Sequence, residues 1–503
     1  MSSKFLAALA SGVLLPLPFL FPSLFPIAWV SLIPLFWLLQ QSRSLRQAFL
    51  FGWLMGGVTY LIGFYWLNYT ISVFGGFSYG LSGLIFLLFA ASAALPLALF
   101  SLLVRLCGAG PLNLFPAFFW VAIEFCSPLL FPWHLANTQS QFLTLIQSAD
   151  LVGPYGTSFL LVWLNATTYD VIFSRDRRGP VRAVAIFSAV LVGTLLYGHF
   201  RLKGVEAEMR RSPALSLAAV QGSIDIRHKW SQAYLESNLQ SYQELTRKIH
   251  GVKLVVWPES AVEAWLPEGL RRLPPELLPS LPRDGSFIFG ARSYRGNPTA
   301  PDLKAFNSAF LTDAEGRVLG HYHKQVLLAF GEYIPFAAIL SNLPGFPPIG
   351  AGFTPGEGPT TLDLPAGIKV APLICYEDLM PALARRLVAE KGAHLLINLT
   401  NDAWFGASVA PWQHARLAQW RAIETRRTLV RVTNTGVTAL ISPKGEILQS
   451  LPTFAPGVLV VNAWVMEGKT LYVRLGDWFG WTITLFALGL VLRRWRSGKL
   501  IGE

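Results

Sequence analysis

Charged residues are scarce in this sequence: Asp, Glu, Lys and Arg make up 14% of its 503 residues. Soluble domains carry roughly a quarter, whereas 52% of this chain is hydrophobic and its mean hydropathy is +0.44. This balance excludes a wholly soluble protein and places much of the chain in lipid. The net charge of +12 falls largely in short loops between apolar runs, so it indicates membrane orientation rather than nucleic-acid binding.

Cysteine is equally scarce, with Cys107, Cys126 and Cys375 alone. So small and odd a set provides no disulfide framework. Cys107 and Cys126 lie in or beside apolar segments, where a cysteine usually packs as a small hydrophobic residue. Cys375 lies in a segment of different character and is treated below as a candidate nucleophile. The chain also lacks an internal repeat and any low-complexity tract.

Long apolar stretches, in contrast, are abundant. Eight of them could cross a bilayer as helices, which takes about 20 residues each. They lie near residues 5–22, 24–40, 48–67, 79–104, 112–132, 156–173, 182–200 and 478–494. No convincing cleavage site follows the first stretch, so we expect an uncleaved first span. The 17 Trp and 35 Phe residues match the aromatic belts of membrane interfaces.

The distribution of basic residues tests this set of spans. With the N-terminus inside, the predicted outer loops 68–78 and 133–155 contain no Lys or Arg. The predicted inner loops and tail hold Arg43, Arg46, Arg105, Arg175, Arg177, Arg178, Arg182, Arg493, Arg494, Arg496 and Lys499. Every short loop thus obeys the positive-inside rule, which puts residues 201–477 on the side opposite the cytoplasm.

Two acidic residues, Glu124 and Asp170, fall within the fifth and sixth predicted spans. Ionisable side chains inside a membrane are functional candidates by default. A hydrogen bond between helices is the structural alternative.

Residues 201–477 have a different sequence pattern, in which short apolar runs alternate with segments of helical periodicity. Strands are predicted at 215–221, 252–257, 286–291, 370–375, 394–399 and 429–433, and helices at 229–250, 379–390 and 412–427. Asp313–Arg317 and Ser442–Glu446 have the composition of hairpin turns. Strands alternating with helices predict an α/β domain, and this segment is long enough to bury its own core.

The predicted organisation is a membrane domain of seven helices over 1–200, a linker over 201–213, an external α/β domain over 214–464, and an eighth membrane helix with a cytoplasmic tail over 465–503. Residues 331–365 are rich in Pro, Gly and Phe and show little periodicity. A long aromatic loop of this kind predicts a functional lid rather than a disordered segment.

Three residues of the α/β domain stand where catalytic groups usually lie. Cys375 follows a predicted strand at a strand-to-helix turn, where a helix N-terminus would favour the nucleophilic thiolate. Glu259 follows a strand and Trp-Pro, at the end of the sheet where α/β sites gather. Lys324 could neutralise a developing oxyanion. Taken singly, each has a plainer interpretation: an inert buried cysteine, a solvated loop carboxylate and a surface lysine.

His321 and His323 come just before this lysine and could mimic a metal site. No other Cys or His spacing supports zinc, so we expect neither a metal nor a cofactor.

Together the three candidate residues resemble the Glu-Lys-Cys triad of the nitrilase superfamily. The likeness extends to Gln221-Gly222, to Glu332 in FGEY, to the run 398–406 (NLTNDAWFG), to Trp412-Gln413-His414 and to Asn434-Thr435-Gly436 before a hairpin. These motifs cover about residues 214–464 and imply an αββα sandwich. With the membrane helices around it, the whole chain resembles the apolipoprotein N-acyltransferase family, the enzymes of the last step of bacterial lipoprotein maturation.

The resemblance implies a mechanism and its partners. Cys375 would attack an ester carbonyl of a phospholipid, with Glu259 as general base and Lys324 stabilising the oxyanion. The resulting thioester would pass its acyl chain to the N-terminal amine of a diacylglyceryl-cysteine, in ping-pong order. The expected partners are a phospholipid acyl donor, a diacylated apolipoprotein acceptor and membrane lipids, without nucleic acid. We expect a monomer in the bacterial inner membrane, with the catalytic domain on the periplasmic side.

The resemblance also assigns supporting residues. Glu332 would hold Lys324 or assist proton transfer, unless it is merely solvated. Tyr376 and Glu377 would shape the pocket beside the nucleophile. Trp230 would contact the substrate, or else pack at the start of a helix.

Two rival functions remain open on the sequence. A membrane-tethered amidase or nitrilase acting on a small C–N substrate would share the triad, although seven preceding spans exceed what an anchor needs. A transporter or receptor with an external binding domain would usually show repeats and broken helices. A binding module would also have no need for Glu259, Lys324 and Cys375 together at the ends of these elements.

Overall fold

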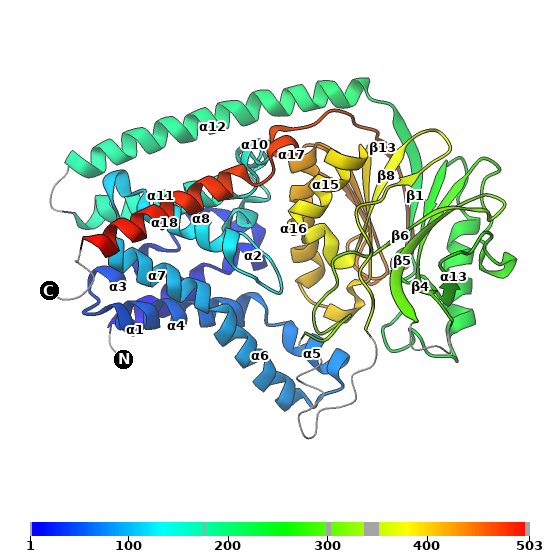
Figure 1. The fold of residues 1–503 in the computed structure, drawn as a ribbon, viewed down its shortest axis with the longest axis horizontal. Helices are drawn as coiled ribbons and strands as arrows, with labels where there is room; N and C mark the ends of the chain where they lie inside the picture. The colour runs from blue at the N-terminus through cyan, green and yellow to red at the C-terminus, as the bar shows by residue number, and fades with distance from the viewer. Residues whose placement is uncertain (1–2, 175–177, 298–302, 336–351, 498–503) are drawn as a thin grey trace. The chain divides into compact units, whose positions relative to one another are not determined.

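The chain divides into a helical unit, residues 1–204 with 475–503, and an α/β unit, residues 205–474. The computed structural model describes residues 3–174, 178–297, 303–335 and 352–497 (Figure 1). Each unit is taken by itself below, with the element labels of Figure 1.

Helices make up the whole regular structure of the described part of the first unit. Its α-helices are α1 (Ser3–Leu14), α2 (Leu17–Leu20), α3 (Ile33–Gln40), α4 (Leu45–Gly63), α5 (Leu67–Gly75), α6 (Tyr79–Ala93), α7 (Leu95–Cys107), α8 (Phe115–Cys126), α9 (Leu143–Ile146), α10 (Ala149–Val152), α11 (Tyr155–Phe173), the start of α12 (Arg178–Arg211) and α18 (Trp478–Arg496). Three 3-10 helices join them, Pro22–Trp29, Pro111–Asn113 and Leu135–Gln139.

Four helical stretches among the described residues are long and apolar enough to cross a membrane: Ser3–Leu20, Pro22–Gln40, Tyr79–Cys107 and Arg178–Arg211. A fifth is added if α4 and the start of α5, which meet at a bend of 65°, count as one span. The structure therefore supports the prediction of a polytopic helical region but only part of the predicted eight spans.

The remaining three predicted spans differ from a regular membrane helix for identifiable reasons. The stretch at 112–132 contains α8, whose 12 residues reach about 18 Å at 1.5 Å per residue, and its helix ends at Cys126. Helix α11 has 19 residues, but polar side chains such as Asn165 and Asp170 interrupt its apolar sequence. Helix α18 also has 19 residues and ends in three arginines.

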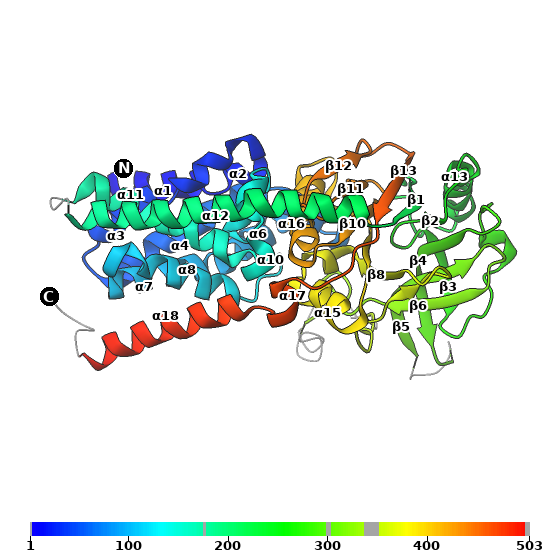
Figure 2. The same ribbon diagram turned by 90° about the horizontal axis from the view of Figure 1, so that it is seen from above.

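Helix α12 corrects the predicted linker. It runs unbroken from Arg178 to Arg211, so residues 201–211 are helical rather than a flexible connection (Figure 2). No proline interrupts residues 181–211, and a helix can continue past its apolar part when its polar turns face water.

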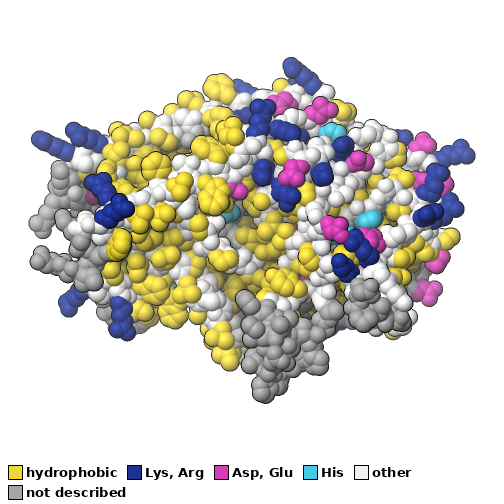
Figure 3. All heavy atoms as spheres, in the orientation of Figure 1, with side chains coloured by type: hydrophobic (Ala, Val, Ile, Leu, Met, Phe, Trp, Pro, Cys, Tyr) yellow, Lys and Arg dark blue, Asp and Glu magenta, His cyan; other side chains and the backbone are white. Residues whose placement is uncertain are grey.

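Basic groups gather at one end of the helical unit. Lys4 donates to the carbonyl of Gln41, and Arg105 donates to that of Ser42, so two of the predicted inner segments lie at the same end as the chain's start. Over this unit, the face seen in Figure 3 is covered largely by hydrophobic side chains, with Lys and Arg beyond them at one end. The arrangement agrees with the loop charges from which the topology was predicted.

Glu124 and Asp170 both have partners within the helical unit. Glu124 Oε1 accepts hydrogen bonds from Trp120 Nε1 and from the backbone N–H of Leu135, each at 2.7 Å. Asp170 accepts one from Asn113 Nδ2 at 3.2 Å. The contacts with Leu135 and Asn113 join separate helices, which favours the structural interpretation of both acidic residues.

Two β-sheets form the centre of the α/β unit. The first has seven strands in the order β13-β1-β2-β4-β5-β6, with β3 paired to β4, and the second has six in the order β12-β11-β10-β9-β8-β7. The strands are β1 (Ala214–Gln221), β2 (Leu254–Val256), β3 (Val262–Pro267), β4 (Ser286–Arg295), β5 (Lys304–Asp313), β6 (Val318–His323), β7 (Leu362–Asp363), β8 (Lys369–Ile374), β9 (Leu395–Thr400), β10 (Thr428–Thr433), β11 (Ala439–Ile441), β12 (Ile447–Ser450) and β13 (Gly457–Trp464). The helices are α13 (Leu235–Arg247), α15 (Pro381–Lys391), α16 (Ala410–Thr425) and α17 (Leu471–Leu475).

Side chains along each strand alternate between the two faces of its sheet, and this alternation forms the buried layers of the domain. On β1, Leu215, Leu217 and Ala219 enter the core between the sheets, while Ala218 and Val220 join the core under α13. The second sheet repeats this pattern, with alternate residues of β9 facing the first sheet or the core under α15 and α16. Both faces of the central strands β1 and β9 are thus buried, which gives the predicted αββα sandwich (Figure 1).

The register also confirms both predicted hairpins. Residues 314–317 connect the antiparallel strands β5 and β6, and residues 442–446 connect β11 and β12. All six predicted strands and all three predicted helices of this unit are present, with ends shifted by up to about six residues. The largest shift is at α13, which starts at Leu235 rather than at 229 because residues 226–234 form turns.

Candidate active site

The three predicted catalytic residues meet at the ends of strands from both sheets. Glu259 follows β2 by three residues, Lys324 follows β6 directly, and Cys375 follows β8 directly. Lys324 Nζ lies 3.9 Å from Glu259 Oε1, and the charges of both side chains act on the pKa of the Cys375 thiol. Strands distant in sequence therefore bring an acid–base group, a cation and a thiol into one cluster.

Glu259 is held by two donors. The side-chain amide of Asn307 donates to Oε1 at 2.8 Å, and the backbone N–H of Asn401 donates to Oε2 at 3.0 Å. Gly290 of β4 passes so close that a Cβ there would lie 2.7 Å from the Glu259 Cα. Burial raises the pKa of Glu259 above its usual range, against the opposing effects of Lys324 and Asn307. The carboxylate is therefore a stronger base than one in water.

Lys324 forms its closest ion pair with Glu332. Its Nζ lies 2.7 Å from Glu332 Oε2; the Lys324 side chain is buried, and that of Glu332 is 11% exposed. Burial alone would lower the pKa of Lys324, but the carboxylates of Glu332 and Glu259 outweigh it and raise the pKa above its usual value. The lysine is therefore a fixed cation rather than a proton donor. Asn307 also donates to Glu332, at 2.9 Å, so one amide links both carboxylates.

Cys375 occupies a sharp turn between a strand and a 3-10 helix, Cys375–Leu379. Its φ is +52°, in the left-handed region that residues other than glycine rarely adopt. Such a conformation costs on the order of 1–3 kcal/mol and clusters at functional sites. The side-chain amide of Asn398 donates to the Cys375 carbonyl at 3.0 Å and helps to hold the turn.

The prediction that a helix N-terminus favours the thiolate is wrong. Burial, followed by the charge of Glu259, raises the pKa of the Cys375 thiol well above its ordinary value, and Lys324 only partly opposes this. The next α-helix, α15, begins six residues later at Pro381. The resting group is therefore a thiol, which needs a base to become a nucleophile, and Glu259 is the carboxylate whose charge acts most strongly on it.

Glu377 is fully buried. It accepts hydrogen bonds from the hydroxyl of Tyr322 and from the backbone N–H groups of Ile374, Gln325 and Val326. These donors come from β6, from the segment after Lys324 and from the residue before Cys375. Glu377 therefore ties the lysine strand to the cysteine turn, and its predicted role in shaping the pocket stays a prediction.

Tyr376 and Trp230 lie at the edge of the cluster and are both partly exposed. Burial raises the pKa of the Tyr376 hydroxyl, with Tyr333 adding to the effect. Trp230 stacks on Trp404 with ring centroids 5.3 Å apart, and its backbone N–H donates to Glu263 at 2.5 Å. The packing interpretation of Trp230 is thus supported, and its contact with substrate stays a prediction.

A buried charge network behind the cluster was not predicted. His414 Nδ1 lies 2.9 Å from Asp402, and its Nε2 lies 2.8 Å from Asp378. Arg431 pairs with Asp378 and lies 3.6 Å from Asp402. Asp378 is on the Cys375 turn, and Asp402 follows Asn401, the donor to Glu259. The network therefore clamps the nucleophile and base segments to each other.

Sequence reasoning missed two further side chains at the site. Asn307 lies on β5, whose strand was not predicted, although a lone amide within AFNSAFL is a signal for a buried polar role. Lys229 is buried and donates to the carbonyl of Ser260 at 2.8 Å, next to Glu259. Burial lowers the pKa of Lys229 to about 8.

The middle of the predicted lid, residues 336–351, lies outside the described residues. The ends of the lid are anchored at the site: Phe353 donates its N–H to the Glu332 carbonyl, and Gly356 to that of Lys324. Among the described residues, Glu268, His321 and His323 have ligand atoms close enough to share a metal ion.

Two family models match the chain. Residues 216–463 match the carbon-nitrogen hydrolase model, and residues 11–167 match the apolipoprotein N-acyltransferase N-terminal domain model. The solved amidase from Nesterenkonia sp. is 21% identical, covers 53% of this chain and 94% of its own, and has a TM-score of 0.35. Saccharomyces cerevisiae Nit3, a nitrilase superfamily member, is 18% identical over 52% of this chain and 95% of its own, with a TM-score of 0.36.

Related proteins named apolipoprotein N-acyltransferase match over nearly the full length. The protein from Geobacter metallireducens is 35% identical, covering 95% of this chain and 92% of its own. The Azotobacter vinelandii protein is 34% identical, covering 98% and 96%, and the Pseudomonas syringae protein is 30% identical, covering 99% and 98%. The chain therefore belongs to the apolipoprotein N-acyltransferase family, with a carbon-nitrogen hydrolase domain as its α/β part.

Proposed function

We propose that this chain transfers a fatty acyl group from a phospholipid to the N-terminal amine of diacylglyceryl-cysteine lipoproteins, through a thioester on Cys375. The observation that carries the proposal is the grouping of Glu259 and Lys324, 3.9 Å apart, around the Cys375 thiol, on which both charges act. Family membership supports the class of substrate, and this grouping supports the roles that we assign to the residues.

In the first half-reaction, Glu259 takes the thiol proton as the sulfur attacks the ester carbonyl carbon. Lys324 stabilises the negative charge that develops on the carbonyl oxygen. The ester C–O bond then breaks, and Glu259 returns the proton to the leaving oxygen, which releases a lysophospholipid. The acyl group remains on Cys375 as a thioester.

In the second half-reaction, the lipoprotein's free amine attacks the thioester carbonyl. Glu259 accepts a proton from the amine, the C–S bond breaks, and the thiol is reprotonated as the amide forms. Because the first product leaves before the amine reacts, the order is ping-pong.

The organisation that we propose for this reaction places residues 214–464 as the catalytic domain and the flanking apolar helices in the bacterial inner membrane. The catalytic domain lies on the periplasmic side, because the predicted short inner loops carry the basic residues. Both substrates are lipids, so helices that hold the domain at the bilayer surface would bring it to their ester and amine groups. The protein acts as a monomer in this scheme.

The test is the intact mass of the purified, detergent-solubilised protein after incubation with a defined phospholipid. We expect a gain of one acyl chain that hydroxylamine removes. The gain should be absent in Cys375→Ala and present in Cys126→Ala, a matched control outside the site. A folded, lipid-binding wild type without an adduct would contradict the acyl-transfer mechanism and favour the tethered amidase.

A further inference from the structure

A second cluster of chemically reactive side chains lies beside the strand that carries Lys324. Residues alternate between the two faces of a strand, so His321 and His323 of β6 share one face, while Tyr322 and Lys324 take the other. Tyr322 bonds to Glu377 and Lys324 to Glu332 on the triad side. The two histidines belong to a different environment.

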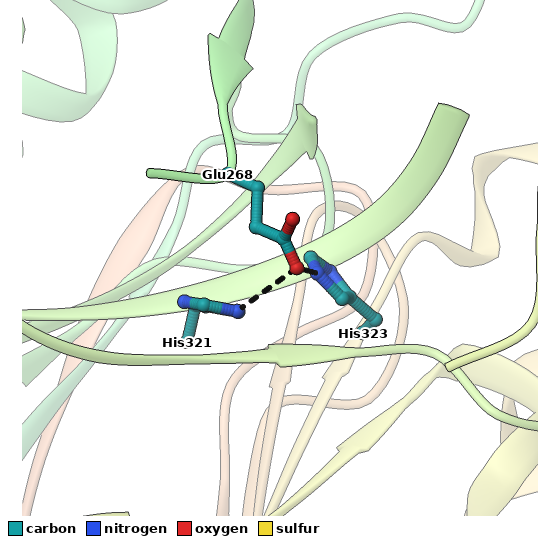
Figure 4. A group of neighbouring side chains, drawn as sticks. All are labelled: Glu268, His321 and His323. Atoms are coloured by element: carbon teal, nitrogen blue, oxygen red, sulfur yellow. Dashed lines mark hydrogen bonds and ion pairs between the residues drawn. The ribbon is translucent and has the colours of Figure 1, made fainter. Parts of the chain in front are cut away.

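Glu268 completes this environment from the end of β3. Its Oε1 lies 3.0 Å from His323 Nε2 and 3.6 Å from His321 Nε2, and the two imidazoles converge on that oxygen (Figure 4). In a tetrahedral site with bonds of 2.0–2.1 Å, ligand atoms lie about 3.3 Å apart. The two observed distances bracket this value, and all three ligand atoms lie within 4.8 Å of one another.

The cluster has the supporting shell that metal-binding histidines usually have. His323 Nδ1 is 2.8 Å from Ser308 Oγ, which is itself 2.6 Å from Ser293 Oγ. A hydrogen bond at Nδ1 orients the ring and leaves Nε2 to offer its lone pair to an ion. His323 is also stacked on Phe306 with ring centroids 4.1 Å apart, which fixes its plane.

The charge of the surrounding cavity suits a cation. A hollow of about 470 Å³ is lined by the cluster together with Arg295, Glu357 and Asp363. Arg295 contacts both oxygens of Glu268, at 2.5 and 2.6 Å, and Glu357 at 2.6 Å. Two carboxylates therefore pair with one guanidinium, Asp363 adds a third negative charge to the lining, and a carboxylate oxygen keeps a further lone pair after accepting one hydrogen bond.

We propose that Glu268, His321 and His323 bind one divalent transition-metal ion, with zinc as the expected ion. Imidazole nitrogens favour zinc over magnesium and calcium, which prefer oxygen ligands. The ion would join the end of β3 to β6 and so stiffen the strand whose next residue is Lys324. The site is separate from the triad and takes no part in the acyl-transfer steps.

The test uses the untagged, full-length protein in detergent, freed of metal with a chelator and titrated with zinc chloride by calorimetry. We expect one saturable zinc per chain, unaffected by excess magnesium. His321→Ala and Glu268→Gln should each weaken binding at least about 10-fold, because each removes one of three ligands. His228→Ala, which removes an exposed histidine outside the cluster, should bind as the wild type does.

A second measurement separates lost binding from lost folding. Zinc should raise the melting temperature of the wild type, since an ion that binds only the folded state stabilises it. At the same zinc concentration it should raise the melting temperatures of folded His321→Ala and Glu268→Gln by clearly less than that of the wild type. The absence of a saturable site in the wild type, or equal zinc affinity in His321→Ala, would overturn the proposal.

Discussion

Lys324 and Glu332 form an ion pair, with Nζ and Oε2 2.7 Å apart, while Glu259 lies 3.9 Å from the same ammonium. Glu332 therefore fixes the cation, and Glu259 remains free to contact the thiol. Because this ion pair holds the ammonium group, its remaining N–H bonds have fixed orientations. Stabilising an oxyanion requires donors that are oriented in advance.

Glu332→Gln tests this division of labour. The amide keeps the shape of the side chain but loses the charge that holds Lys324, so acyl-enzyme formation should slow on the order of 10- to 100-fold. Single-turnover acylation followed by mass spectrometry measures the rate. Glu236→Gln, an exposed carboxylate on α13, serves as the matched control. An unchanged rate in Glu332→Gln would mean that this carboxylate is dispensable for holding the lysine.

Asn307→Leu should change the pH dependence of acylation. The Asn307 amide stabilises the ionised form of Glu259 and so lowers its pKa, against the larger effect of burial. Without this donor the pKa of Glu259 rises further, and less of the base is ionised at a given low pH. The acid limb of the acylation rate should shift to higher pH, with recovery as pH rises. A loss of equal size at every pH would indicate that Asn307 acts only by positioning.

His414→Gln should flatten the pH dependence of stability above neutrality. Burial would lower the pKa of His414, but Asp378 and Asp402 raise it from 6.5 to about 9. Its stabilising effect is therefore fully present below pH 6.5 and disappears as pH rises through about 9, a change of about 3 kcal/mol. Melting temperatures between pH 6 and 10 measure this effect. If wild type and variant lose stability in parallel over that range, His414 is not held protonated.

Gly290→Ala should disrupt the base without touching its side chain. A Cβ at this position would lie 2.6 Å from the backbone nitrogen of Ser260 and 2.7 Å from the Glu259 Cα, so the loop that carries the base must move. We expect acylation to fall about 100-fold, the size that a 1 Å misplacement can produce. Gly269→Ala, where a Cβ meets nothing within 4 Å, should be neutral. Equal activity of both variants would show that this loop tolerates displacement.

Most of the α/β fold could be predicted because its signals are local. Apolar runs of strand length, the helical spacing of 379–390 and 412–427, and the two hairpin turns each depend on a few neighbouring residues. The missed strands, β5 and β6 among them, mix polar residues into the pattern, as at Asn307 and His321. The membrane spans were harder to predict. Residues 112–132 have the composition of a membrane helix, but the α-helix within them, α8, has only 12 residues.

The sequence by itself determined the chemistry available to this protein. Its low charge and long apolar runs require lipid around one part of the chain, and its motifs select Glu259, Lys324 and Cys375. Only the tertiary structure decided what surrounds these groups: that Cys375 rests as a thiol, that Glu332 holds the lysine, and that Glu268 reaches two histidines more than 50 positions away. The physical reason is that burial and charge act through space, so the pKa and partners of a side chain depend on which strands the fold places beside it.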